Sequence, residues 1–153
     1  MQIKTILVPY DFSEYAAYAL TWAGELAKQY QAKVILFHAV PVLSRTVYPE
    51  GMFLLDLSKI ETEAMADADK RLREVVAAKG LTVAVETKAV IGDPMWEICQ
   101  AAEREHVDLI IMGSHGRTGL AHIVLGSVAE RVVRHASCPV LVARKPQAPK
   151  QHE

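Results

Sequence analysis

The sequence of 153 residues has few cysteines, almost no net charge and no long apolar run. Its two cysteines, Cys99 and Cys138, are too few for a disulfide framework and form no CxxC pair. The 17 Lys and Arg residues against 18 Asp and Glu leave a formal net charge of −1, so no overall basic field favours nucleic acid or anionic lipid. No stretch approaches the roughly 20 apolar residues of a membrane span. We therefore expect neither nucleic acid nor a membrane as a partner.

The chain has the length and composition of one globular domain. It is 51% hydrophobic and 23% charged, which argues against disorder. A chain of this size buries roughly 68 to 70% of its unfolded surface. The first acid, Asp11, comes before a signal-peptide apolar region could form. We expect a cytoplasmic protein with one domain over residues 1–145 and a flexible C-terminal tail over 146–153.

Short apolar runs alternate with longer segments of helical period, which is the order that a parallel sheet with crossover helices requires. Most of the runs lack polar alternation, as strands covered on both faces do. This pattern predicts an α/β fold, an open five-stranded parallel sheet with helices on both faces. The predicted strands are 3–9, 33–40, 82–90, 109–112 and 140–143, and the predicted helices are 13–30, 57–79, 94–105 and 127–135.

Four of the eight glycines lie between Gly113 and Gly126, after the fourth predicted strand and before the fourth predicted helix. Glycine lets main-chain N–H groups come close to a ligand, and this segment contains no Asp or Glu. Ser127 and Glu130 fit a capping box, which predicts a helix N-terminus with spare N–H donors and a positive dipole end. Together, the glycines, the absence of acidic residues and the predicted helix N-terminus favour a phosphate site. The alternative is that the glycines only make tight turns and close helix-to-sheet contacts.

Asp11 follows the first predicted strand, and ligands of doubly wound sheets bind at the carboxyl ends of strands beside the topological switch point. We therefore expect this acid to face the glycine loop. Its role is either to cap the next helix in a box with Glu14, or to bond a ribose hydroxyl or reach a phosphate-bound metal through water. The chain lacks GxxxxGK[ST], and it lacks GxGxxG after its first strand. Those absences disfavour a P-loop and a dinucleotide site.

Several segments of the chain resemble the universal stress protein family. They are ILVPYDFS at 6–13, VILFHAV at 34–40, GDP at 92–94 and IIMGSHGRTGLAHIVLGSVAERVVRHASCPVLVAR at 110–144. The spacing of Gly113, Gly116 and the pair Gly126 and Ser127 is similar to that of the ATP-binding branch of the family. The resemblance implies a Rossmann-like sheet of the adenine nucleotide alpha-hydrolase type in strand order 3-2-1-4-5. It also implies a homodimer formed by antiparallel pairing of the last strand, Pro139 to Arg144.

The resemblance further implies ATP, ADP or AMP as the ligand, with Mg²⁺ or Mn²⁺ held by phosphate oxygens and water. No side chain would bind the metal directly, and Asp11 could reach it through water. By position, Pro9 and Asp11 would border the nucleoside and Ala39 would touch the adenine. The phosphates would be surrounded by Gly113, Ser114, His115, Gly116, Arg117, Thr118, Gly119, Gly126, Ser127, Val128 and Ala129.

For function, the resemblance implies a nucleotide-dependent regulator of a stress response with an unidentified protein partner. The sequence shows no obvious general base or carboxylate pair beside the glycine loop, so any ATP hydrolysis should be slow. One alternative is a slow ATP hydrolase or adenylating enzyme of the same fold. Such nucleotidyl transferases usually carry Ser-Gly-Gly where this chain has Pro9-Tyr10-Asp11-Phe12. The other alternative is an interaction module that binds no nucleotide.

Overall fold

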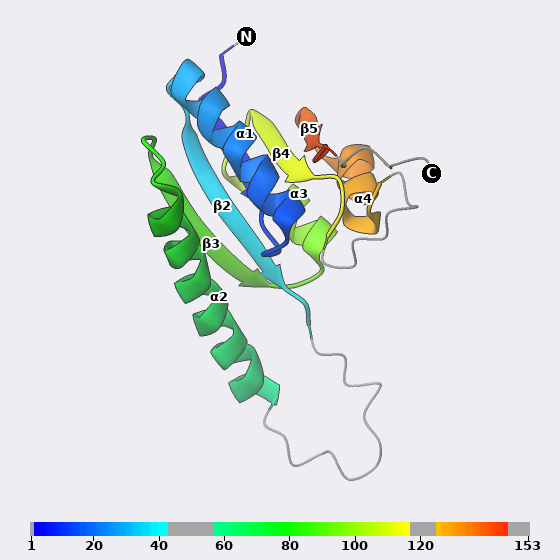
Figure 1. Ribbon diagram of the computed structural model, residues 1–153. Coiled ribbons are helices and arrows are strands. Elements are labelled where there is room, and N and C mark those ends of the chain that lie inside the picture. The colour runs from blue at the N-terminus through cyan, green and yellow to red at the C-terminus, as the bar shows by residue number, and fades with distance from the viewer. Residues whose placement is uncertain (1, 43–56, 117–124, 147–153) are drawn as a thin grey trace, which may run out of the picture.

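The structure is a computed structural model that describes residues 2–42, 57–116 and 125–146. Five strands form one parallel sheet in the order β3-β2-β1-β4-β5 (Figure 1). The predicted α/β class and strand order are confirmed. Along the chain the elements are β1 (Thr5–Pro9), α1 (Glu14–Tyr30), β2 (Lys33–Val40), α2 (Leu57–Lys79), β3 (Val85–Ile91), α3 (Pro94–Arg104), β4 (Leu109–Gly113), α4 (Ser127–His135) and β5 (Val140–Ala143).

The predicted elements differ from the structure mainly at the starts of two strands. The predicted strand 3–9 begins at Thr5, and the predicted strand 82–90 spans Val85–Ile91, while the other elements agree within one residue. A side-chain contact lies at the start of β1. The carboxylate of Asp108, just before β4, accepts hydrogen bonds from the backbone N–H groups of Thr5 and of the preceding residue, at 3.0 and 2.8 Å. The N–H groups at the start of β1 therefore donate to a side chain of the segment before β4.

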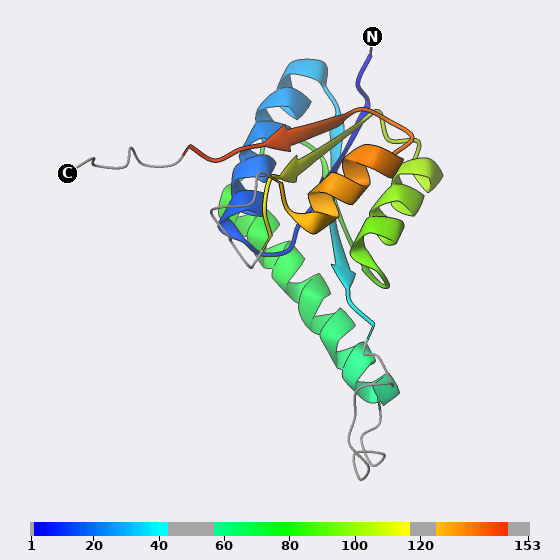
Figure 2. The same cartoon turned by 90° about the vertical axis from the view of Figure 1, so that its right-hand side faces the viewer.

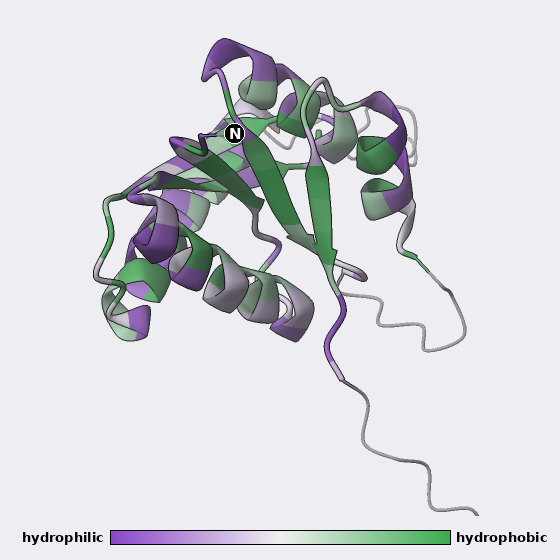
Figure 3. Ribbon diagram, turned by 90° about the horizontal axis from the view of Figure 1, so that it is seen from above, coloured by the Kyte–Doolittle hydropathy of each residue, from purple (hydrophilic) through white to green (hydrophobic). Residues whose placement is uncertain are grey.

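Two apolar clusters lie on opposite faces of the sheet. Successive strand residues point to opposite faces, so Ile6 and Val8 belong to the cluster under α1 and α2, and Leu7 belongs to the cluster under α3 and α4 (Figure 2). Figure 3 shows the strands as the most hydrophobic part of the fold, with hydrophilic residues on the outer sides of the helices. Strands buried on both faces are typical of parallel sheets.

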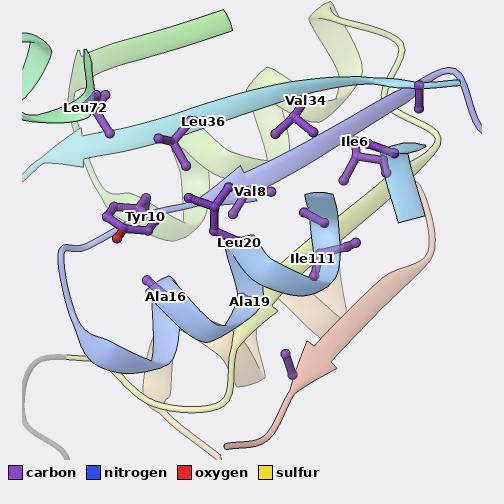
Figure 4. Packing of buried hydrophobic residues seen from close by; sticks show 14 residues of the cluster. Ile6, Val8, Tyr10, Ala16, Ala19, Leu20, Val34, Leu36, Leu72 and Ile111 are labelled. Atoms are coloured by element: carbon purple, nitrogen blue, oxygen red, sulfur yellow. The ribbon is translucent and has the colours of Figure 1, made fainter. Parts of the chain in front are cut away.

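Helix α1 packs on the sheet through small side chains. Ala16, Ala19 and Ala23 are buried around Leu20, which contacts the strand residues of the first cluster (Figure 4). Short side chains let the helix backbone come close to the strands, and this closeness matters for the site described below. Among the described residues, no helix has the length and apolar character needed to cross a bilayer. The predicted tail is described only at Pro146, and residues 147–153 lie outside the described residues.

An ion pair joins the edge strand β3 to the end of α3. Lys88 of β3 donates a hydrogen bond to Glu105, and Lys88 also lies 3.2 Å from Glu86. The hydrogen bond to Lys88 lowers the pKa of Glu105, and the same bond raises the pKa of Lys88. Since the folded pKa of Glu105 is depressed, its contribution to stability is present above the ordinary carboxyl range. That contribution is lost as the pH falls through the lowered pKa.

We expect Glu105→Gln to lower the free energy of unfolding at neutral pH by less than about 1 kcal/mol, because the pair is partly exposed to solvent. The difference from the wild type should shrink in acid, where the wild-type carboxylate also becomes neutral. Urea denaturation of both proteins at neutral and acidic pH measures this. A difference that stays constant between the two conditions would contradict the electrostatic origin.

Candidate functional site

A cavity of about 330 Å³ lies at the carboxyl ends of β1, β2 and β4. The strand order explains its position. The sheet continues in opposite directions from β1 and β4, and the connections that leave these two strands cover opposite faces, which opens a crevice between them. Pro9 at the end of β1 and Gly113 at the end of β4 both line the cavity.

Most of the predicted site residues line this one cavity, although they come from three separate segments of the sequence. Ser114 does not line it: the residue is 2% exposed, and its hydroxyl lies 2.9 Å from Nδ1 of His115. Arg117, Thr118 and Gly119 lie outside the described residues. The role of each residue in binding stays a prediction. Those that line the cavity are Pro9, Asp11, Ala39, Gly113, His115, Gly116, Gly126, Ser127, Val128 and Ala129.

The described glycines of the loop serve close approach rather than unusual backbone angles. Among the described glycines only Gly80 has a φ in the left-handed region, at 57°. A Cβ atom on Gly113 would lie 2.8 Å from the backbone carbon of Tyr15, so this glycine lets α1 pack against β4. A Cβ atom on Gly116 would lie 2.8 Å from Oδ2 of Asp11. The close helix-to-sheet contact considered as the alternative is therefore real at Gly113, whereas Gly116 brings the loop to the acid.

Helix α4 begins at the cavity. The predicted capping box is wrong in its details: the N-cap is Gly126, Ser127 is already the first helical residue, and no described side chain caps the helix. Glu130 instead accepts a hydrogen bond from Arg134 at 2.8 Å. The N–H of Gly126 donates to the carbonyl of Ser114 at 2.7 Å, which holds the start of α4 beside the end of β4. The first N–H groups of a helix have no intrahelical partner, so this end suits an anion.

Asp11 faces the glycine loop, as expected from its place after β1. The alternative that Asp11 caps α1 is wrong, because the N-cap is Ser13, whose hydroxyl accepts from the N–H of Ala16 at 3.2 Å. Asp11 uses Oδ1 to accept from the N–H of Ser13 at 3.0 Å. Its Oδ2 is the oxygen that a Cβ on Gly116 would meet. The carboxylate thus lies between the turn after β1 and the loop after β4.

His38 and Tyr10 form part of the cavity wall and were not predicted as site residues. Nδ1 of His38 lies 2.7 Å from the carbonyl oxygen of Tyr10. A carbonyl oxygen only accepts, so Nδ1 of His38 carries the proton. Burial raises the pKa of the Tyr10 hydroxyl, and the negative charge of Asp11 raises it further. Tyr10 is therefore neutral at physiological pH. The sequence signal for His38 was its place beside Ala39 at the end of a predicted strand.

The rest of the wall is apolar and consists of residues that were not predicted as part of the site. Pro41 follows β2 and Pro94 opens α3, so the carboxyl ends of β2 and β3 were the available signals for both. The remaining wall residues, Phe37, Ile98 and Met112, read as ordinary core positions in the sequence. A cavity with an apolar wall and a backbone-rich rim fits a ligand with a flat apolar ring and an anionic group. Among the described residues, no group of three or more His, Cys, Asp or Glu side chains could hold a metal ion.

The comparisons with known proteins all point to one protein family. Residues 2–144 match the Universal stress protein family. Universal stress protein MJ0531 of Methanocaldococcus jannaschii is 39% identical over 145 residues, which are 94% of this chain and 84% of that protein. The structure of MJ0577, from the same archaeon, has a TM-score of 0.82 at 33% identity and covers 97% of this chain and 100% of its own. A universal stress protein in complex with cAMP has a TM-score of 0.66 at 25% identity, covering 94% and 98%.

Proposed function

We propose that this chain, which belongs to the universal stress protein family, binds an adenine nucleotide, ATP, ADP or AMP, in the cavity at the carboxyl ends of β1, β2 and β4. The observation that carries the proposal is the start of α4, which no described side chain caps and which lies beside two glycines at the rim of a partly apolar cavity. A helix start of this kind favours phosphate. The relative with bound cAMP supports an adenine nucleotide as the ligand.

The residues of the cavity fit such a ligand in three parts. The phosphates would lie against Gly113, Gly116 and the first turn of α4, and the family resemblance also assigns Arg117, Thr118 and Gly119 to the phosphates. Pro9 and Asp11 would border the ribose, and Ala39 the adenine. Mg²⁺ or Mn²⁺ would arrive with the nucleotide, held by phosphate oxygens and water and reached by Asp11 through water.

Little or no catalysis is expected at this site. Asp11 is the only acidic residue among the described residues that line the cavity. Phosphoryl transfer depends on positioned charges and on a base or water-orienting group, and a single carboxylate supplies few of these. The protein would then act as a cytoplasmic regulator of a stress response, in which bound nucleotide changes a surface that a protein partner contacts.

The edge strand β5 is the proposed dimer contact. Within the sheet, β5 pairs with β4 alone, and Val140, Leu141 and Val142 are half-buried. An open edge strand with apolar side chains invites pairing with another strand. Antiparallel pairing of residues 139–144 with the same residues of a second copy would satisfy both edges. Sedimentation of the purified protein tests this, and a monomer at micromolar concentration would contradict it.

Calorimetric titration with ATP and Mg²⁺ tests the proposed ligand. We expect the wild type to bind below millimolar ATP, and Gly116→Ala to weaken binding by about tenfold, equivalent to about 1.4 kcal/mol. The new Cβ would displace the carboxylate of Asp11, and a side chain can move without unfolding the protein. The urea midpoint should therefore change little.

Gly24→Ala is the matched control, because its Cβ would also meet the end of one side chain, Leu81, at 2.8 Å, but it does not line the cavity. We expect this variant to bind ATP as the wild type does. Absence of wild-type binding at millimolar ATP would overturn the proposal. If Gly116→Ala lost stability and neither this variant nor the wild type responded to nucleotide, the interaction module would be favoured. The packing role of Gly113 is the observation that supports that alternative.

A further inference from the structure

The turn between β1 and α1 contains an unusual backbone conformation. Phe12 has a φ of 65°, in the left-handed region, where a bulky side chain is a genuine outlier. The other described non-glycine residues with positive φ, Gln31 and His106, lie just after the ends of α1 and α3, where this conformation is common. Phe12 instead precedes a helix and adjoins the cavity. A strained residue persists only where its surroundings hold it, and such residues cluster at functional sites.

Three side chains from three parts of the fold hold the Phe12 ring. The guanidinium carbon of Arg71, on α2, lies 3.8 Å from the ring centroid, which is a cation–π contact. The ring centroid of His38, on β2, is 4.9 Å away, and that of Tyr10 is 5.5 Å away with the rings nearly perpendicular at 88°. Tyr10 and His38 line the cavity, whereas Arg71 does not. The Phe12 ring therefore connects α2 to the cavity wall.

The backbone at Phe12 also sets the direction of Asp11. The hydrogen bond from the N–H of Ser13 to Oδ1 of Asp11, at 3.0 Å, spans Phe12. A change of φ at Phe12 to the ordinary negative region would rotate the N–H of Ser13 away from that oxygen. Asp11 would then lose the bond that orients its carboxylate toward Gly116. The contacts of the Phe12 ring are thus linked to the orientation of the Asp11 carboxylate through the backbone torsions of Phe12.

We propose that Phe12 is a positioning residue for the nucleotide: its ring, clamped under Arg71 of α2, holds the left-handed turn that directs Asp11 toward Gly116. The inference rests on the proposed function, in which Asp11 borders the nucleotide. It makes nucleotide affinity depend on Arg71, a residue on a helix that contributes nothing to the described wall of the cavity.

Arg71→Met tests the clamp, because methionine keeps an apolar side chain over the ring and removes the cation. We expect the Kd for Mg²⁺–ATP, measured by calorimetry, to rise by about two- to fivefold. Arg71→Lys should recover part of the affinity, since it restores a charge but not the planar group. Arg73→Met is the matched control: Arg73 is also on α2, pairs with Asp69 at 2.7 Å, and should leave the Kd unchanged. Equal affinities of the Arg71→Met and Arg73→Met variants would overturn the proposal.

A double-mutant cycle shows whether Phe12 acts through Asp11. Glycine adopts positive φ without strain, so Phe12→Gly keeps the turn accessible while removing the ring. We expect Phe12→Gly to weaken ATP binding by about three- to tenfold, and to add almost nothing in the Asp11→Asn background. Additive losses would overturn the positioning role. A wild type that binds no ATP would refute the proposed function itself, whereas a wild type that binds, with additive losses, refutes only this inference.

Discussion

Gly113→Ala is expected to lower the free energy of unfolding by about 2 to 3 kcal/mol, near the top of the usual range for overpacking. The new Cβ would lie 2.8 Å from the backbone carbon and the Cβ of Tyr15 and 2.9 Å from its carbonyl oxygen. These atoms belong to the first turns of α1, so they cannot yield as a side-chain tip can. Helix α1 would have to move away from β4. Its buried alanines would then lose their contact with the sheet. Urea denaturation of the wild type and the variant measures the loss.

Gly24→Ala is the control for this prediction as well. Its Cβ would meet Cδ2 of Leu81 at the same 2.8 Å, but that atom is the end of a flexible side chain. Within a helix, alanine is favoured over glycine by up to about 1 kcal/mol, so this variant should be as stable as the wild type or more so. If Gly113→Ala proved as stable as Gly24→Ala, the close approach of α1 to β4 would be contradicted.

Ser127→Asp is expected to weaken ATP binding by about ten- to a hundredfold while leaving the protein folded. Ser127 is exposed, lines the cavity and is the first residue of α4. A carboxylate in the first turn interacts favourably with the helix dipole, by about 0.3 to 1 kcal/mol, so stability should hold or rise. The same carboxylate would repel the phosphates of a nucleotide held at this helix start. Calorimetric titration with ATP and with uncharged adenosine separates the two effects, because adenosine should lose little.

Ser127→Asn is the control of similar size without the charge, and its affinity should stay within about twofold of the wild type. Raising the salt concentration should restore part of the affinity of the Asp variant, since salt screens the repulsion at an exposed position. If the Asp and Asn variants bound ATP equally well, the start of α4 would not be the phosphate site, and the proposed function would lose its main support.

The N-cap positions of α1 and α4 show what a sequence pattern alone does not determine. Asp11 with Glu14 and Ser127 with Glu130 both satisfy the local pattern of a capping box, yet the actual N-caps are Ser13 and Gly126. A capping pattern can be satisfied at neighbouring positions, and local propensity alone does not choose between them. The choice was made by tertiary contacts: the carboxylate of Asp11 turns toward the β4 loop, and the Gly126 N–H bonds the carbonyl of Ser114.

The cavity wall shows a similar division. The glycine spacing and the acid after β1 could be recognised in the sequence because glycine clusters and acidic residues are unusual at the ends of buried strands. Phe37, Ile98 and Met112 were not, because an apolar residue in a strand or helix looks the same whether it faces the core or a cavity. The strain at Phe12 could not be read either, since a backbone torsion of a phenylalanine leaves no trace in composition or periodicity.

The amino-acid order by itself determined the alternation of strands and helices, the two-sided burial of the sheet and the place of the glycine loop. These follow from hydrophobic periodicity and from residues with special backbone properties, which act over a few neighbours. Only the tertiary structure decided which residues share the cavity, which glycines meet a helix or an acid, and how α2 reaches the site through Arg71 and Phe12. Those features depend on distances between segments far apart in the chain, and such distances exist only after the sheet has brought the segments together.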